Sequence, residues 1–561
     1  MLETDSRKRT LPKLRPFIQG FFFLLFLFLF WRISFPFTED LTKNFFFNID
    51  PLILLGLALS GSLVLTALLA SLATVLATVF FGRIFCGWIC PLGSVFDFFA
   101  RYIPDRKKEK NYGKGKYKNG KYYLLSFFVF GSLFGLTIAL FLDPLVFFFR
   151  VLTLNVYPPS VYAANFFLDL IRPAALSLGY TKLSMLSFQQ PVFDLALFSL
   201  LLFLGAVGLI SLERRFWCRN ICPLGALLSL LARFSPRGRR VSDACIECSK
   251  CAKACPMNAI AETYTETSAH ECIQCERCET VCPVDAISFG FAAPGEQKYS
   301  FSPSRRGMLI SAAGGILAAS AAVSAVPRQI INPSLIRPPG ALVEKDFLNT
   351  CVRCGECMKA CPTHGLQPSI LQAGFEGFYT PVLMSRVGGC EDKCNMCGKI
   401  CPTGAIRNLP LMEKQYAVMG NATIERNLCI AWEQGKLCLI CDEVCPYDAV
   451  EFRMVTDEKG TIQRPYVIED KCVGCGMCEK ACPVKGKAAI FVTPINEVRK
   501  NSGSYITEKV KRLRTVKDDN VDYYKEIRVE SGGKVPQPAL SAPSSPADSM
   551  PENELPPGFV K

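Results

Sequence analysis

The chain has 561 residues, of which 50% are hydrophobic and 20% charged, with a formal net charge of +14. This apolar content is high for a soluble protein, and the length allows several domains. The positive charge collects beside apolar segments, which indicates membrane topology and contact with anionic lipid, so nucleic-acid binding is not needed to explain it.

Four long apolar segments in the first part of the chain are predicted to cross a membrane. Each reaches the roughly 18–20 residues that span a hydrocarbon core about 30 Å thick, and a buried soluble helix would be shorter and amphipathic. The segments are residues 17–36, 52–81, 122–149 and 192–212.

Lysine and arginine gather in the flanking regions 7–15, 106–121 and 214–240. These regions are predicted to be cytoplasmic, because positive charge marks the inner side of membrane proteins. The sparsely charged segments 37–51 and 150–191 are predicted to face outward. The sequence therefore predicts a multi-pass protein of the bacterial inner membrane, with residues 1–306 carrying the cytoplasmic clusters.

Two matching segments follow the second and fourth predicted spans, and both contain Cys-x3-Cys-Pro-Leu-Gly. Their four cysteines, Cys86, Cys90, Cys218 and Cys222, are called the CPLG cysteines below. They are predicted to hold a seventh cluster or to act as redox thiols beside a quinone site, and the sequence leaves these alternatives open. Ordinary packing of buried cysteines at helix ends explains neither the duplication nor the shared motif.

Six compact runs of four cysteines, each ending in Cys-Pro, follow these segments. Each matches or closely varies the bacterial ferredoxin pattern C-x2-C-x2-C-x3-C-P, in which three thiolates hold one 4Fe-4S cluster and the fourth binds the neighbouring cluster. The two alternatives are structural zinc sites and disulfides. Zinc sites usually pair two separated C-x2-C hairpins, which these compact runs do not contain, and thiolates that bind a cluster are not free to form disulfides. Six 4Fe-4S clusters are therefore predicted. The metal ligands are Cys245, Cys248, Cys251 and Cys255 (run 1); Cys272, Cys275, Cys278 and Cys282 (run 2); Cys351, Cys354, Cys357 and Cys361 (run 3); Cys390, Cys394, Cys397 and Cys401 (run 4); Cys429, Cys438, Cys441 and Cys445 (run 5); and Cys472, Cys475, Cys478 and Cys482 (run 6).

A small residue followed by an aliphatic one stands at a fixed distance after five of these Cys-Pro pairs. This repeat predicts a short strand after each run. The pairs are Ala259-Ile260, Ala286-Ile287, Gly365-Leu366, Ala405-Ile406 and Ala449-Val450.

A fifth apolar segment, residues 310–326, follows Ser304-Arg305-Arg306-Gly307-Met308-Leu309 and resembles a twin-arginine export signal. An ordinary membrane span would give the same topology, with the chain outside from about residue 327. Val323-Ser324-Ala325 resembles a signal-peptidase site, so cleavage stays open.

The histidine content excludes haem. Only His270 and His364 are present, no C-x-x-C-H occurs, and neither histidine lies in a predicted span. Both are interpreted as surface or loop residues. The chain also lacks a phosphate-cradling glycine loop, which does not rule out flavin.

The motifs in this order resemble two families of bacterial electron-transfer proteins. The first 290 or so residues resemble the membrane ferredoxins of the NapH and MauN type, with four spans, two Cys-x3-Cys-Pro segments and a paired ferredoxin domain. Residues from 304 to about 492 resemble their exported NapG and MauM partners. The matching motifs there are the twin-arginine signal, Arg337-Pro338-Pro339-Gly340-Ala341-Leu342, Thr380-Pro381 and Cys401-Pro402-Thr403-Gly404-Ala405-Ile406.

The resemblance implies a fusion of both partners that oxidises menaquinol from the membrane quinone pool and passes electrons to a periplasmic reductase or cytochrome. It also implies that run 1 pairs with run 2, run 3 with run 6, and run 4 with run 5. A maturation factor that keeps a partner's metal centre reduced is the alternative function, and a passive cluster scaffold is a third. No catalytic residue is assigned.

The expected fold is an α-helical membrane domain with four spans and a signal or anchor helix, joined to α+β bacterial-ferredoxin-type domains. The last segment is rich in proline and serine and is expected to be disordered. The expected divisions are 1–240 (membrane domain), 241–292 (cytoplasmic two-cluster domain), 293–327 (linker and signal helix), 328–500 (exported four-cluster domain) and 501–561 (tail).

Overall fold

The structure is a computed structural model, and it describes residues 10–33, 44–59, 65–103, 119–134, 137–291, 303–325, 335–457 and 460–506. Residues 1–514 form one compact unit. The predicted basic residues near the N-terminus before Thr10, most of the basic loop 106–121 and nearly all of the predicted tail lie outside the described residues.

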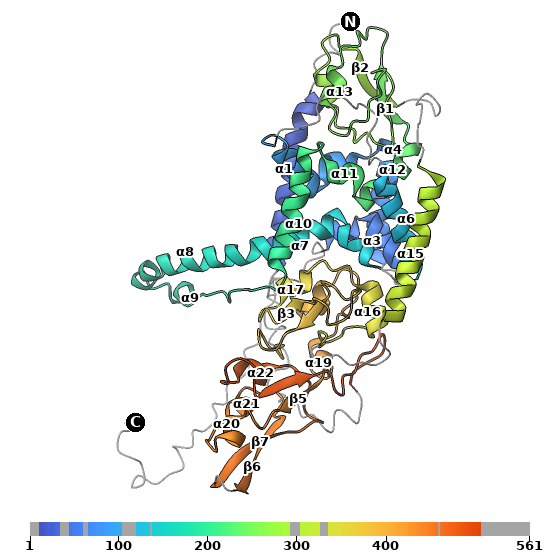
Figure 1. Ribbon diagram of the computed structural model, residues 1–561. Helices are drawn as coiled ribbons and strands as arrows, with labels where there is room; N and C mark the ends of the chain where they lie inside the picture. The colour runs from blue at the N-terminus through green and yellow to red at the C-terminus, as the bar shows by residue number, and fades with distance from the viewer. Residues whose placement is uncertain are drawn as a thin grey trace, which may run out of the picture. The chain divides into compact units, whose positions relative to one another are not determined.

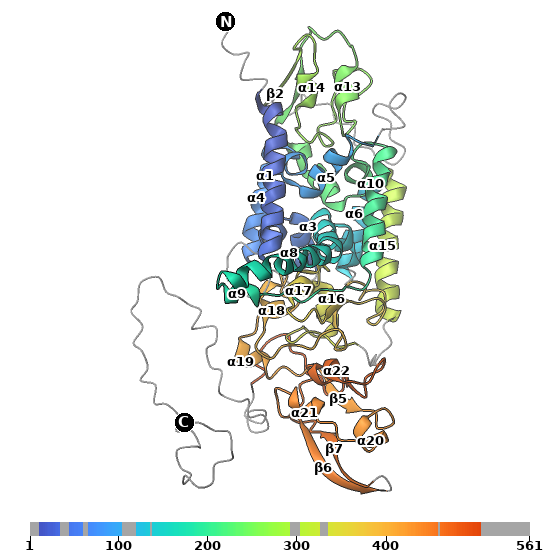
Figure 2. The ribbon, with the colours of Figure 1, turned by 90° about the vertical axis from the view of Figure 1, so that its left-hand side faces the viewer.

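Helices make up the described chain up to residue 234 (Figures 1 and 2). Two single π turns, Phe85–Ile89 and Leu152–Val156, and short 3-10 turns at Thr137–Leu142, Leu209–Ser211 and Ala232–Phe234 interrupt them. The α-helices are α1 (Thr10–Arg32), α2 (Phe45–Asn48), α3 (Pro51–Leu59), α4 (Leu65–Phe81), α5 (Pro91–Phe99), α6 (Gly120–Leu133), α7 (Pro144–Val151), α8 (Tyr157–Ser177), α9 (Thr181–Ser184), α10 (Ala196–Gly208), α11 (Phe216–Asn220) and α12 (Pro223–Leu231).

Among the described residues, one helix is long and apolar enough to cross a membrane, at Lys13–Arg32. The other three predicted spans do not form single long helices, which corrects the sequence prediction. Segment 52–81 contains α3 and α4, segment 122–149 contains α6 and α7, and α10 covers 13 residues. The break before α7 has a physical cause, since Asp143 precedes Pro144 and a residue before proline is disfavoured in a helix.

The Asp-Pro pair at this break is repeated at the start of α3. The Asp143 Oδ1 atom accepts hydrogen bonds from the Leu145 and Val146 amides at 2.8 and 3.1 Å, and Asp50 Oδ1 accepts one from Leu52 at 2.8 Å. Both carboxylates are buried. Each carboxylate therefore accepts hydrogen bonds from amides that have no partner within the helix. The residue that follows it is a proline, which is favoured at the first position of a helix. The Asp-Pro helix start is thus a second element that occurs twice in the helical part, in addition to the CPLG segment that the sequence analysis recognised.

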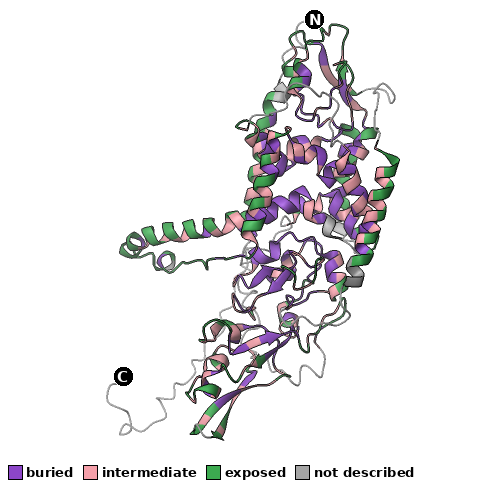
Figure 3. Ribbon diagram, in the orientation of Figure 1, coloured by how far each residue is buried: buried purple, intermediate pink, exposed green. Residues whose placement is uncertain are grey.

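Helix α15 (Arg305–Ala325) coincides with the predicted signal or anchor segment and packs along α6 (Figures 1 and 2). The packing is close, because a Cβ atom added at Gly315 would lie 2.3 Å from the Phe127 carbonyl oxygen. Helix α8, by contrast, is exposed along most of its length (Figure 3).

Four two-stranded antiparallel sheets and short helices form the rest of the described chain. The first sheet starts at Arg237, so the first ferredoxin domain begins before the predicted boundary at 241. The sheets pair β1 (Arg237–Val241) with β2 (Ile287–Phe291), β3 (Leu366–Pro368) with β4 (Pro381–Leu383), β5 (Asn421–Ile424) with β8 (Ile490–Thr493), and β6 (Val450–Asp457) with β7 (Gly460–Val467). The helices are α13 (Lys250–Ala254), α14 (Arg277–Thr280), α16 (Glu344–Thr350), α17 (Glu356–Ala360), α18 (Met396–Ile400), α19 (Leu411–Lys414), α20 (Ile430–Glu433), α21 (Ile440–Glu443) and α22 (Met477–Ala481).

The predicted strand after each run is confirmed at three positions, where Ile287, Leu366 and Val450 begin β2, β3 and β6. At the other two positions, Ile260 and Ile406 form isolated β-bridges. Each of these strands or bridges therefore begins five residues after the last cysteine of its run.

Candidate iron–sulfur centres

A short helix separates the third and fourth cysteines of each run. In run 3, Cys357 lies on α17 and Cys361 caps its C-terminal end with an extended backbone, as expected for a residue before proline. A helix rises about 1.5 Å per residue, so four residues move the fourth cysteine roughly 6 Å along the axis. Runs 1, 4 and 6 end α13, α18 and α22 in the same way.

Three cavities are each lined by three cysteines of one run and the last cysteine of another. A site is named below for the run that supplies three thiols. The run 2 site contains Cys272, Cys275, Cys278 and Cys255; the run 5 site contains Cys429, Cys438, Cys441 and Cys482; and the run 6 site contains Cys472, Cys475, Cys478 and Cys445.

Electrostatic contacts between cysteines define the run 3 and run 4 sites in the same way. Cys401, the last cysteine of run 4, interacts with the three leading cysteines of run 3, and Cys361 interacts with those of run 4. In the run 1 site, Cys251 interacts with Cys245 and shares an apolar cluster with Cys282. The structure thus pairs run 3 with run 4 and run 5 with run 6. The pairing implied by the resemblance, run 3 with run 6 and run 4 with run 5, is wrong for this chain.

The small residue after each Cys-Pro pair has a structural role at these sites. The amides of Ala259, Ala286 and Ala449 donate hydrogen bonds to the Sγ atoms of Cys255, Cys282 and Cys445, at 3.3 to 3.4 Å. All three alanines are buried. A larger side chain would have to displace the core beside the cysteine, and the amide stabilises a thiolate at that position.

These sites fit 4Fe-4S clusters in donor chemistry. Each of the three cavities is lined by four thiols and by aliphatic side chains. Among the described residues, no group of His, Cys, Asp or Glu side chains has the spacing for a single metal ion. A cluster bound here would supply one-electron chemistry.

Burial keeps these thiols protonated when no iron is bound. It raises the pKa of Cys394, Cys441 and Cys475 to about 12 in each case. Because the metal-binding form is the thiolate, loading of a cluster releases protons.

The four sites of runs 3 to 6 follow one another in a fixed order. The amide of Cys390, in the run 4 site, donates to the carbonyl of Cys475, in the run 6 site, at 2.7 Å. The exchange of last cysteines joins run 3 to run 4 and run 5 to run 6. The order is therefore run 3, run 4, run 6, run 5, which differs from the order in the sequence.

The CPLG cysteines come together in the structure, although 128 residues separate Cys90 from Cys218 by numbering. Cys90 interacts electrostatically with Cys86 and Cys218, and Cys222 interacts with Cys218 and Cys86. Cys86 also packs against the apolar residues around Cys272 and Cys275 of the run 2 site. The indole of Trp88 strengthens this contact by donating to the Gln274 carbonyl at 3.0 Å.

Two arginines at this location were missed by the sequence analysis. Arg83 and Arg215 each stand three residues before the first CPLG cysteine of their segment and are fully buried. Alignment of the two segments would have revealed them as Arg-x2-Cys-x3-Cys-Pro-Leu-Gly. His270 and His364 lie outside the helices and strands, in agreement with the loop interpretation, but both are buried and so are not surface residues. The His364 ring lies between Tyr157 and Phe193.

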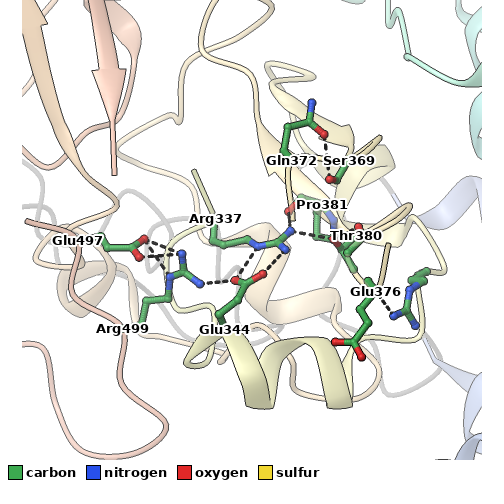
Figure 4. Close-up of polar contacts among 11 residues, drawn as sticks. Arg337, Glu344, Ser369, Gln372, Glu376, Thr380, Pro381, Glu497 and Arg499 are labelled. Carbon is green, nitrogen blue, oxygen red and sulfur yellow. Dashed lines mark hydrogen bonds and ion pairs between the residues drawn. The ribbon is translucent and has the colours of Figure 1, made fainter. Parts of the chain in front are cut away.

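Two of the motifs that carry the family resemblance in residues 335–506 meet in one polar network (Figure 4). Arg337 donates from Nη1 to Thr380 Oγ1 at 2.9 Å and to the Pro381 carbonyl at 2.8 Å, and its Nη2 atom pairs with Glu344 at 2.6 Å. Arg499 contacts the same carboxylate from the far end of the domain. Ala341 also forms a β-bridge with Ile406, which connects the first motif to the segment after run 4.

Glu271 joins the run 2 domain to the helical part of the chain. It accepts hydrogen bonds from Lys121 at 2.5 Å and Arg83 at 3.2 Å, and all three side chains are buried. Burial alone would raise the pKa of Glu271, but Lys121 and Arg83 outweigh burial and lower it to about 2. The carboxylate is therefore ionised at neutral pH and anchors the domain.

We expect Glu271→Gln to destabilise the packing of residues 237–291 by about 1.5–3 kcal/mol, because the two buried cations lose a charged acceptor. Amide hydrogen exchange measures this as faster exchange in β1 and β2. Asp169→Asn is the control, since Asp169 pairs with Arg172 on the exposed α8, where the loss is within about 1 kcal/mol. Unchanged exchange in the Glu271 variant would contradict the anchoring role.

Paired runs that exchange their last cysteine, repeated along one chain, define a multi-cluster ferredoxin-type iron–sulfur protein. Sequence comparisons agree: the profile described as "4Fe-4S dicluster domain" matches residues 244–286 and 436–485, and two "4Fe-4S binding domain" profiles match 63–111 with 195–242, and 347–367. No solved structure matches the chain.

Known relatives identify the family. The methylamine utilization ferredoxin-type protein MauM of Methylorubrum extorquens is 40% identical over 207 residues, which cover 34% of this chain and 90% of that protein. The ferredoxin-type protein NapG of Escherichia coli is 33% identical over 208 residues, 35% of this chain and 87% of NapG. The chain belongs to this MauM and NapG family of ferredoxin-type, electron-transferring iron–sulfur proteins, and the relationship extends over about a third of its length.

Proposed function

We propose that this protein is a membrane-bound quinol dehydrogenase component that passes electrons from menaquinol, through six or more 4Fe-4S clusters, to a periplasmic reductase or cytochrome. The observation that carries the proposal is the continuous order of the cysteine sites. The run 2 site, which includes Cys255 of run 1, adjoins Cys86. The segments of runs 1 and 2 lie at one end of the helical part and those of runs 3, 4, 6 and 5 at its other end (Figure 1).

The proposed topology places runs 1 and 2 in the cytoplasm and the chain after about residue 327 outside. Two observations support it. Lys359 of run 3 is buried against the carbonyls of Phe30 and Ile33, at the C-terminal end of α1, whereas Arg15 near the other end of α1 contacts the carbonyl of Gly87. We further propose that the helical part is a multi-pass inner-membrane domain in which shorter helix segments together cross the bilayer. The packing of α15 along α6 favours an anchor that is retained over a cleaved signal.

Electrons are proposed to leave from the run 5 site. It is the last site in the exported order, and Leu437, beside its ligand Cys438, is 65% exposed. An acceptor that docks at this surface approaches the terminal cluster directly.

The test is reduction of the purified full-length protein, prepared anaerobically in detergent, by a reduced menaquinone analogue. We expect bleaching of the iron–sulfur absorbance and the appearance of cluster signals in electron paramagnetic resonance spectra. Full reduction by dithionite or by a cytoplasmic ferredoxin, with none by the quinol analogue, would overturn the quinol step.

The alternative function, delivery of electrons for maturation or maintenance of a partner metalloenzyme, is favoured by one observation. Cys248 of run 1 is exposed, so the run 1 site is open to a cytoplasmic donor. Deletion of the gene separates the two functions: loss of turnover with a fully assembled partner supports the respiratory role, and a partner that lacks its metal supports the maturation role.

A further inference from the structure

The CPLG cysteines form one site built from both halves of an internal repeat. Each half alone supplies only two thiols, too few to hold a cluster with cysteine alone. In the structure, Cys218 interacts electrostatically with Cys86 and Cys90 of the other half, and Cys222 interacts with Cys86. All four are free cysteines, and Cys90 and Cys222 are buried.

The arginines of the repeat cross between the halves. Arg215 donates from Nη1 to the Cys86 carbonyl at 2.9 Å and from Nη2 to the Gly93 carbonyl at 3.2 Å. Correspondingly, Arg83 Nη2 lies 3.1 Å from the position that a Cβ atom would take at Gly225. Arg83 also lies 4.0 Å from Cys86 Sγ, and the Gly225 amide donates to Cys222 Sγ at 3.2 Å. The glycine of each Cys-Pro-Leu-Gly therefore makes room for the opposite arginine.

Buried groups of both signs surround these thiols, including Asp143, which interacts electrostatically with Cys222. Asp97 pairs with Arg15 and Arg215, and Glu271 pairs with Arg83 and Lys121. The four cationic side chains are at most 3% exposed. A cluster held by four thiolates is anionic, and Arg83 Nη2 and Arg215 Nη1 both lie beside Cys86.

The site also stands between the two groups of ferredoxin clusters. On one side, Cys86 adjoins the run 2 site. On the other side, Trp217, the neighbour of Cys218, stacks on Phe147 with ring centroids 5.1 Å apart. Arg150, one turn further on, lies 4.9 Å from the Tyr379 ring and interacts electrostatically with Cys354 of the run 3 site. Packed side chains thus connect the CPLG cysteines to the first exported site.

We infer that Cys86, Cys90, Cys218 and Cys222 bind one further iron–sulfur cluster, with Arg83 and Arg215 as its charge-compensating positioning residues, and that this cluster connects the run 2 and run 3 sites. The connecting role rests on the proposed function, whereas the binding of a cluster does not. Of the two roles that the sequence left open for these cysteines, a seventh cluster or redox-active thiols beside a quinone site, the inference favours the cluster.

Native mass spectrometry of the anaerobically purified full-length protein tests the inference by counting clusters in the most heavily loaded form. Seven 4Fe-4S clusters correspond to about 28 iron atoms per chain, and six to about 24. We expect the larger number for the wild-type protein and the loss of one cluster, with its paramagnetic signal, in both Cys90→Ser and Cys222→Ser. Ser126→Ala, which alters a buried residue of α6, is the control and keeps all clusters.

A count of about 24 iron atoms in the wild-type protein would overturn the inference. This measurement needs no variant, so it stays decisive even if a variant fails to fold. A full count that Cys222→Ser leaves unchanged would overturn it as well. Neither result depends on the electron donor, so failure of the inference is distinguishable from failure of the quinol reaction.

Discussion

Cys397→Ser is expected to stop electrons from reaching the run 6 and run 5 clusters while the run 3 cluster remains reducible. The run 4 site lies between run 3 and run 6 in the spatial order, so loss of its cluster leaves a gap in the middle of the route. Loss of a direct ligand should exceed the roughly 10–100-fold effect of losing an outer-shell partner. Rapid-freeze paramagnetic resonance after addition of the reductant resolves which clusters become reduced.

Cys438→Ser is the matched control, because the run 5 site lies at the end of the route. We expect the clusters of runs 3, 4 and 6 to be reduced at the wild-type rate in this variant, with transfer to an external acceptor impaired. If both variants behaved alike, or if Cys397→Ser still passed electrons to the run 6 cluster, the linear order would be contradicted.

Arg337→Met is expected to lower the free energy of unfolding of the domain formed by residues 335–506 by about 1–3 kcal/mol. The buried acceptors Thr380 and Pro381 lose their donor, and Glu344 keeps only its contact with Arg499. Methionine keeps the apolar stem over the Phe347 ring, where the guanidinium carbon lies 4.6 Å from the centroid. The lost contacts are those with Glu344, Thr380 and Pro381 (Figure 4). Denaturant unfolding of the full-length protein, followed by the iron–sulfur absorbance, measures the loss.

Arg453→Met is the control for this experiment. Arg453 pairs with Glu451 on the exposed β6–β7 hairpin, where an ion pair contributes at most about 1 kcal/mol. Equal effects of the two substitutions would contradict the role assigned to the Arg337 network.

The same network makes the free energy of unfolding of residues 335–506 depend on pH in the acid range. Burial alone would raise the pKa of Glu344, but Arg337 and Arg499 outweigh it and lower the pKa. A carboxylate with a lowered folded-state pKa stabilises the fold fully above its unfolded pKa of about 4.3, and the contribution is lost as the pH falls through the folded value. In Arg337→Met, the acid-dependent part of the unfolding free energy below about pH 4.3 should therefore shrink.

Much of the iron–sulfur chemistry could be predicted from the sequence because its signals are local. Three cysteines spaced by two residues sit on one loop and one short helix, as in run 3 with Cys351, Cys354 and Cys357. The alanine four residues after Cys445 was visible as a repeat, and the structure adds that its amide bonds to that sulfur. The helix lengths were predicted less well. Mean hydropathy stays high across Asp143-Pro144, although this pair ends one helical segment and begins α7.

The sequence by itself determined the number of cysteine runs, their ferredoxin spacing and the duplication of the CPLG segments, because each is a pattern within about a dozen residues. Only the tertiary structure decided which run receives Cys361 or Cys401, the order of the sites of runs 3 to 6, and the meeting of Cys90 with Cys218. The physical reason is that a fourth thiolate leaves its own loop at the end of a short helix. Its destination is then set by which domains pack together, and the spacing of residues along the chain does not encode that packing.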